Sequence, residues 1–224
     1  LLLVGGFIVS FLFASYFSDS AHEAHTQTGL VFAVLGSIGL VSSTDLGLII
    51  LFFQMISLAS YPMVGLIRSD PRGNEAVLKL FLFSAVSFAV MAFGMTFLYG
   101  LSGSLELRAI GNTLAGANTT WVILAVGLVV AGYAFEMTTV PFQFWAPDVY
   151  AGTTAPVAGF LSVIPKIAGF AALLRIATLM LPTASWWPTL IGVAAVLTMT
   201  YGNLLALRQK RLKRLFAYSS IAQA

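Results

Sequence analysis

Long apolar runs dominate the chain, and short polar segments separate them. A helix needs about 20 residues to cross ~30 Å of hydrocarbon, and these runs lack the period-two alternation of a half-buried strand. Seven runs are therefore predicted to be membrane helices, and an eighth begins after RQKRLKR. The seven cover residues 1–18, 28–43, 46–66, 75–100, 120–150, 153–180 and 187–207. Because Pro141 and Pro147 interrupt the fifth run, we expect a discontinuous helix near Pro141. The predicted fold class is an all-α polytopic membrane protein with about eight transmembrane helices.

The composition supports this prediction. The chain is 59% hydrophobic and 8% charged, whereas a soluble domain carries about 25% charged residues. Disorder requires low hydrophobicity and high net charge, so it is also excluded. The absence of cysteine excludes disulfides, thiolate metal sites and iron–sulfur clusters. Five of the 11 basic residues lie between Arg208 and Arg214. The net charge of +3 is thus local, and nucleic acid is not an expected partner.

The chain reads as one membrane unit. No soluble domain or low-complexity linker separates the apolar runs, so residues 1–224 are predicted to form a single transmembrane domain. The sequence begins at Leu1 rather than at a methionine, and it ends inside a helical pattern at Ala224. We interpret it as an internal piece of a longer chain.

The basic residues of the loops predict the orientation, because cytoplasmic loops carry an excess of Lys and Arg. The even-numbered connections between helices hold Arg108 alone. The odd-numbered connections hold Arg68, Arg72, Arg208, Lys210, Arg211, Lys213 and Arg214. The odd connections, including the Arg208–Arg214 loop, are therefore predicted to lie on the cytoplasmic or equivalent negative side.

Four charges fall inside the apolar runs: Lys79, Glu136, Lys166 and Arg175. A charge at the bilayer centre costs about 2.5–3.5 kcal/mol on insertion scales, so such residues face the bundle interior and carry function. Two of them have simpler interpretations. Lys79 stands four residues after Glu75 and can form an i,i+4 pair with it at the interface. Arg175 lies near a helix end, where an interfacial anchor is the favoured interpretation.

Glu136 and Lys166 lie far from the ends of their runs. A buried carboxyl without a partner binds a proton rather than staying charged, so Glu136 is a candidate proton-exchanging group or the partner of a lysine from another helix. A static structural pair is the alternative. Pro141 follows five residues later, and a broken helix can leave backbone groups open to water or ions; a simple proline kink is the alternative. Lys166 is about 13 residues from either end of its run, too far to snorkel easily.

The sequence gives no support for a metal site, a nucleotide or flavin site, or a nucleophile–base pair. His22 and His25 flank Glu23, but no third metal ligand is evident, so a solvated loop is favoured over a metal site. No glycine-rich strand–helix turn suggests a nucleotide or flavin site. Neither histidine has a nearby serine in helical register. The chain is expected to bind no redox cofactor and to perform no redox chemistry itself.

One long segment resembles a known family. Residues 132–175 read GYAFEMTTVPFQFWAPDVYAGTTAPVAGFLSVIPKIAGFAALLR, and EAVLKLFLFSAV at 75–86 and RLKRLFAYSSIAQ at 211–223 flank them. FFQMISLASYP at 52–62 is a weaker match. These motifs resemble the antiporter-like membrane subunits of respiratory complex I, the proton-pumping NADH:quinone oxidoreductases, most closely subunit N (subunit 2 in mitochondria).

The resemblance implies an inverted-repeat fold in a chain of about 14 helices. The first repeat would cover about 29–180, and the second would start within 187–224. Lys79 and Lys166 would be lysines of a buried proton pathway, and Pro141 would break the discontinuous helix. NADH and quinone would be used by the whole complex. This subunit would sit among the other membrane-arm subunits of that complex. The membrane would be a bacterial plasma membrane or an equivalent energy-transducing membrane.

Three positions depart from the family pattern. The family has Glu where Gln54 stands, Lys where Glu136 stands and usually His where Gln143 stands. One hypothesis is a rewired proton circuit, in which Glu136 pairs with Lys166 or Lys79 and carries the proton, while Gln54 and Gln143 order water or hydrogen bonds. A second hypothesis is a structural spacer that no longer pumps. A third is a subunit of a cation/proton antiporter, which shares the fold and the broken helix.

Overall fold

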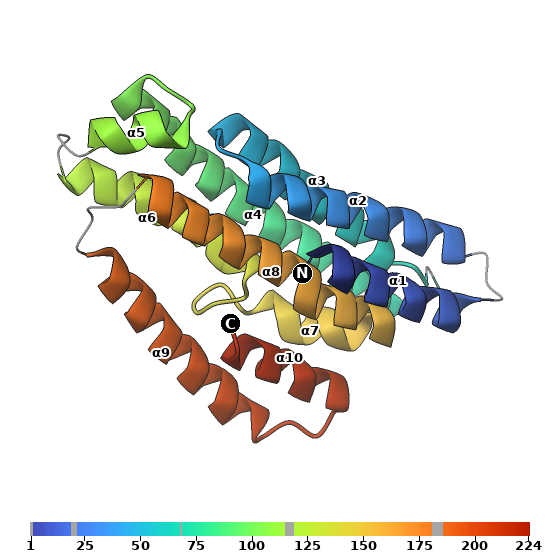
Figure 1. The fold of residues 1–224 in the computed structure, drawn as a ribbon. Coiled ribbons are helices and arrows are strands. Elements are labelled where there is room, and N and C mark those ends of the chain that lie inside the picture. The colour runs from blue at the N-terminus through green and yellow to red at the C-terminus, as the bar shows by residue number, and fades with distance from the viewer. Residues whose placement is uncertain (1, 19–21, 68, 115–118, 181–185) are drawn as a thin grey trace.

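The computed structural model describes residues 2–18, 22–67, 69–114, 119–180 and 186–224, and within them the chain forms ten helices and no strand. Arg68, which entered the orientation argument, lies outside the described residues. Figure 1 shows the helices, most of which run roughly alongside one another. They are α1 (Leu2–Phe17), α2 (Glu23–Ser42), α3 (Leu46–Val64), α4 (Pro71–Ser102), α5 (Leu107–Leu114), α6 (Thr119–Glu136), α7 (Trp145–Gly152), α8 (Ala155–Met180), α9 (Trp187–Ala206) and α10 (Leu212–Ala222).

The predicted membrane helices are confirmed. In the described part of the chain, α2, α3, α4, α8 and α9 are long and apolar enough to cross a membrane, and α1 and α6 are apolar but shorter. The long run at 120–150 is divided between α6 and α7, which confirms a discontinuous helix near Pro141. Helix α10 is the start of the eighth run. Many large apolar side chains face outward, as expected where the solvent is lipid.

Local signals set several helix ends. The Asp45 side chain caps α3 by accepting a hydrogen bond of 2.8 Å from the Gly47 N–H. Asp70 caps α4 in the same way, with Pro71 as the first helical residue. Helix α4 therefore begins four residues earlier than the apolar run suggested. It ends at Gly103, whose φ of 68° is the left-handed conformation that glycine adopts easily.

The segment between α4 and α6 was expected to be a loop, and it contains a short helix instead. Helix α5 is amphipathic and buries Leu107, Ile110 and Leu114, which are spaced for one helical face. Its start is held by two backbone bonds, from the Leu107 N–H to the Thr44 carbonyl and from the Leu46 N–H to the Leu105 carbonyl, each 2.9 Å. The helix closes one end of the bundle.

Helices α4 and α6 pack closely because glycines stand at their contact. A Cβ at Gly94 would come within 2.8 Å of the Ala125 carbonyl oxygen, and a Cβ at Gly132 would come within 2.5 Å of the Met91 Cβ. Small residues let membrane helices approach each other in this way. The contact fixes α6, and with it the end of α6 at Glu136, against the long helix α4.

Candidate functional site

The helical conformation is interrupted between α6 and α7. Helix α6 ends at Glu136 in a Schellman motif: the Thr138 N–H bonds to the Phe135 carbonyl at 3.0 Å, and the Thr139 N–H bonds to the Ala134 carbonyl at 2.9 Å. Thr138 adopts a positive φ of 59°, which is rare for a β-branched residue. The helix thus ends before Pro141, and Pro141 lies in the segment that links it to α7.

The backbone at the break is well bonded. The Trp145 indole N–H reaches back to the Phe135 carbonyl at 3.2 Å, and the Val140 N–H donates to the Thr198 hydroxyl of α9 at 3.0 Å. The Phe142 N–H bonds to the Thr139 carbonyl at 2.7 Å. We expected the break to leave backbone groups open to water or ions, and this expectation is wrong for these groups.

Glu136 is buried at the end of α6, with 7% of its surface exposed. It lines an internal cavity of about 10 Å³, which is about the space that one water molecule needs. Four hydroxyl-bearing residues of α3 and α4 line the same cavity: Ser57, Ser60, Tyr61 and Ser84. The Tyr61 and Ser84 hydroxyls are hydrogen-bonded to each other. Among the described residues, no side chain forms a hydrogen bond or ion pair with the Glu136 carboxyl.

Lys166 is equally buried, near the middle of α8. Its ammonium donates to the backbone carbonyl and to the hydroxyl of Ser220 on α10, both at 2.7 Å. The predicted ion pair between Glu136 and Lys166 is therefore not formed, because neutral oxygens of α10 bind the ammonium. Helices α6 and α8 are still in contact close to Glu136. A Cβ at Gly169, three residues after Lys166, would lie 3.7 Å from the Cβ and Cγ of Glu136.

Two further buried polar side chains belong to the break and to α7, namely Gln143 and Tyr150. Tyr150 of α7 is within electrostatic range of Glu136 and lies beside Ser220, the residue that binds Lys166. Its hydroxyl does not reach hydrogen-bond geometry with any described protein group, and neither does the side-chain oxygen of Gln143. Gln143 and Tyr150 are each 1% exposed. Buried polar atoms without a protein partner normally bind ordered water, so these two oxygens are candidate water-binding groups.

Lys79 belongs to a different site. Its ammonium pairs with Glu75 at 2.7 Å and with Asp148 of α7 at 2.6 Å, and Asp148 also pairs with Arg214 of α10 at 2.7 Å. The i,i+4 interpretation of Lys79 is therefore confirmed, with Asp148 as an additional partner. The predicted pair between Lys79 and Glu136 is not formed. Lys79 is 35% exposed and lines a charged cavity of about 720 Å³, whereas Glu136 lines the small internal one.

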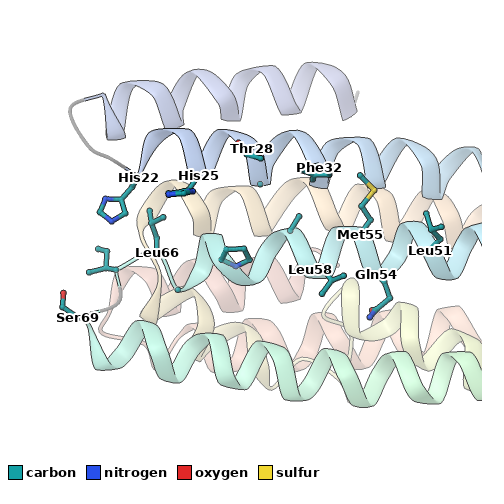
Figure 2. A pocket seen from close by; sticks show the side chains of 15 residues that line it. His22, His25, Thr28, Phe32, Leu51, Gln54, Met55, Leu58, Leu66 and Ser69 are labelled. Atoms are coloured by element: carbon teal, nitrogen blue, oxygen red, sulfur yellow. The ribbon is translucent and has the colours of Figure 1, made fainter.

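Gln54 is also separate from Glu136. It lines an open groove of about 1400 Å³ along α2 and α3, together with His22 and His25. Figure 2 shows the two histidines at one end of this groove and Gln54 farther along it. The described residues hold no group of three metal-ligating side chains.

Arg175 of α8 lies at the other end of the bundle from Lys79. Its guanidinium donates to the Val41 carbonyl at 3.1 Å, at the C-terminus of α2. A cation at this position also interacts favourably with the helix dipole. Arg175 lines a cavity with Glu106 and Arg108 of the even-numbered loop. The interpretation of Arg175 as an anchor near a helix end is consistent with this contact.

The sequence interpretation missed the hydroxyl groups around Glu136 and the partner of Lys166. It also missed Asp148, the partner of Lys79. A signal for three of the missed residues was present, since Asp148 and Tyr150 lie in the quoted PDVY motif and Ser220 lies in YSS. The serines of α3 and α4 gave no such signal, because isolated serines are common in packed membrane helices.

The family described as "NADH:quinone oxidoreductase/Mrp antiporter, TM" matches residues 43–224. The chain belongs to this family. Membership and the apolar helices together make it a multi-pass integral membrane protein. The resemblance to the antiporter-like membrane subunits of complex I, inferred from the sequence motifs, is thereby confirmed.

Members of this family with similar sequences include NADH-quinone oxidoreductase subunit N of Chlorobium chlorochromatii, 41% identical over 87% of this chain and 40% of its own length. The subunit N of Geobacillus kaustophilus is 38% identical over the whole chain and 48% of its own length. A solved structure of respiratory complex I from Thermus thermophilus matches with a TM-score of 0.83 and 35% identity, covering 100% of this chain and 47% of the other. The chain thus spans about half the length of these relatives.

Proposed function

We propose that this chain is part of a proton-translocating, subunit N-type membrane subunit of an NADH:quinone oxidoreductase. The observation that carries the proposal is the burial of an acid and a lysine, Glu136 and Lys166, beside the break between α6 and α7. Uncompensated ionisable groups inside a membrane protein mark ion and proton pathways. The similarity to subunit N relatives supports the identity of the complex.

The geometry suggests how a proton would move. Glu136 would exchange a proton with a water in its small cavity, which the Tyr61 and Ser84 hydroxyls line. Lys166 would exchange a proton through the Ser220 hydroxyl, to which it is already bonded. Tyr150 would connect the two, since it lies beside Ser220 and near Glu136. Gln143 would order water with its unbonded side-chain oxygen.

The remaining predicted residues would act from farther away. Lys79 would influence Glu136 and Lys166 only electrostatically, because its direct partners are Glu75 and Asp148. In its groove, Gln54 would form hydrogen bonds with water or with a neighbouring subunit. Pro141 would help to keep α6 and α7 separate, because it cannot donate a helical hydrogen bond.

The proposal includes the assembly. The chain would sit among other membrane-arm subunits, and NADH and quinone would react in those partners, with no redox centre in this chain. Residues of about 29–180 would form the first inverted repeat, and 187–224 would begin the second. The membrane would be a bacterial plasma membrane or its equivalent. The basic Arg208–Arg214 loop would face the cytoplasm.

The decisive experiment measures proton translocation into sealed vesicles with Glu136→Gln, at a matched rate of electron transfer. We expect a lower proton yield per electron, because the amide cannot exchange a proton. Glu106→Gln is the control, since Glu106 is an exposed carboxylate of a loop; its yield should match the parent. An unchanged yield in Glu136→Gln contradicts the proposed role.

A second candidate is the spacer that does not pump, and it draws support from the amide of Gln54, which lines a groove separate from the cavity of Glu136. The variant Gln54→Glu combined with Glu136→Lys restores the family's residues and separates the candidates. A working circuit should tolerate the double change better than either single change. In a spacer, the proton yield is the same in all three variants. An antiporter subunit, the third interpretation, would be identified by purification with antiporter partners rather than with a quinone-binding membrane arm.

A further inference from the structure

The cavity around Lys79 has a charge imbalance that its own side chains do not compensate. It lies between α4, α7 and α10 and is lined by five cationic side chains and two carboxylates. The cations are Arg72, Lys79, Arg211, Lys213 and Arg214, and the carboxylates are Glu75 and Asp148. If all seven are ionised, the cavity has a net charge of +3.

The ion pairs in the described part of the chain leave three of these cations without a carboxylate. Glu75 and Asp148 are occupied by Lys79 and Arg214. Lys213 donates to a backbone carbonyl, that of Thr153, at 2.5 Å. Arg72 and Arg211 are exposed and form no ion pair with a described residue. The cavity is therefore an electropositive site with free donors.

The backbone adds to this preference for an anion. Helix α10 begins at Leu212, and its N-cap residue Arg211 makes no side-chain capping bond. The first N–H groups of α10 are therefore not capped by a side chain of Arg211, and the positive end of the helix dipole lies at the cavity. The Arg214 Nε is buried and has no hydrogen-bond partner among the described residues.

The surroundings of the cavity indicate which kind of anionic ligand it would bind. The cavity lies at the end of membrane-spanning helix α4, on the side of the odd-numbered loops. Leu212 lines it and is 70% exposed, and Phe216, one turn farther along α10, is 64% exposed. A ligand that combines a phosphate with acyl chains satisfies both the cations and these apolar side chains. Basic pockets between membrane helices bind anionic lipid headgroups in this way.

We propose that the cavity formed by α4, α7 and α10 binds the phosphate headgroup of an anionic phospholipid. Arg72, Arg211 and Lys213 contact the phosphate, and the ion pairs of Asp148 hold the three helices around it. The volume of about 720 Å³ falls within the ~300–1000 Å³ of typical small-ligand sites. The proposal does not rest on proton transfer, so it holds whether or not the subunit pumps.

The test is a titration of the full-length protein, in detergent, with phosphatidylglycerol, followed by native mass spectrometry. Arg72→Gln and Arg211→Gln should each weaken lipid binding by about fivefold. Lys210→Gln is the matched control, because Lys210 is an exposed cation of the same loop that does not line the cavity; its affinity should equal that of the parent. Phosphatidylcholine, whose headgroup is zwitterionic, should bind more weakly than phosphatidylglycerol.

Two results overturn the proposal. If Lys210→Gln weakens binding as much as Arg211→Gln, the attraction comes from the general basicity of the loop and not from the cavity. If inorganic phosphate at millimolar concentration displaces phosphatidylglycerol and binds as tightly, the ligand is a free phosphate and not a lipid. Added salt should weaken the binding of phosphatidylglycerol, because part of the cavity is open to solvent.

Discussion

Lys79 and Lys166 are both lysines on membrane helices, yet their ammonium groups have opposite kinds of partners. Lys79 lies near the start of α4 and bonds to two carboxylates, Glu75 and Asp148. Lys166 lies in the middle of α8 and bonds only to the neutral oxygens of Ser220 among the described residues. Glu136, the buried carboxyl at the end of α6, lines a separate small cavity.

Under the proposed function, the difference separates charges that hold helices together from charges that exchange protons. At the bundle end, partly hydrated ion pairs hold α4, α7 and α10 together at low cost. In the interior, a tight ion pair would keep the carboxyl deprotonated and the ammonium protonated. Glu136 and Lys166 form no ion pair with each other, so in the proposed pathway neither charge is fixed by the other. Four substitutions test this comparison.

The largest effect is expected from Lys166→Met. The change removes the interior ammonium, and a positioned acid–base group contributes about 10²–10⁴-fold to proton transfer. Proton translocation through this subunit should fall by about 100-fold or more, while stability should be kept, because a buried charge is replaced by an apolar chain of similar length. Proton uptake into vesicles measures the first effect and thermal unfolding the second. Lys210→Met, on an exposed loop, is the control; translocation that persists in Lys166→Met contradicts the comparison.

The next effect concerns the break beside Glu136. Thr198→Val leaves the Val140 N–H without its bond, which should cost about 1–3 kcal/mol of stability. Thermal unfolding in detergent checks this. Thr200→Val is the matched control, because the Thr200 hydroxyl bonds only to the Val196 carbonyl of its own helix. Equal losses in both variants would mean that the link between α9 and the break contributes nothing.

A smaller effect is expected from Asp148→Asn at the bundle end. It removes the carboxylate that Lys79 and Arg214 share, and the loss should be about 1 kcal/mol because the site is about one-third exposed. The difference from the parent should shrink in 1 M salt, which screens exposed charges. A loss that does not change with salt would place Asp148 in the same class as the interior groups.

The smallest effect is expected from Glu75→Gln. Lys79 keeps its bond to Asp148, and an exposed i,i+4 pair contributes about 0.3–0.5 kcal/mol. Comparison of its unfolding temperature with that of Asp148→Asn ranks the two partners of Lys79. A loss as large as that of Asp148→Asn would show that the three charges act as a single network.

Helix positions were predictable from the sequence because hydrophobic length is a local property. The break near Pro141 was predictable for the same reason, although the helix ends five residues earlier through a Schellman motif at Thr138. The start of α4 was missed although Asp70 and Pro71 are recognised start signals. Helix α5 was missed because its amphipathic pattern spans only eight residues.

The candidate site was less predictable, because its contacts join residues far apart in the chain. Burial of Glu136 and Lys166 followed from their places within apolar runs. The pairing of Lys166 with Ser220, 54 residues later, depends on how α8 meets α10. The pairing of Lys79 with Asp148, 69 residues later, depends likewise on how α4 meets α7. Helical periodicity gives no information on which helices become neighbours.

The hydrogen bond from Val140 to Thr198 has a consequence for biogenesis. The two residues are 58 positions apart, so the donor at the break is synthesised and inserted well before its acceptor on α9. Until α9 enters the membrane, the Val140 N–H lacks this partner. The segment between α6 and α7 therefore reaches its final bonding only after α9 has been inserted. The bonding of the break thus depends on a helix that follows it in the chain, as the bonding of Lys166 depends on Ser220 of α10.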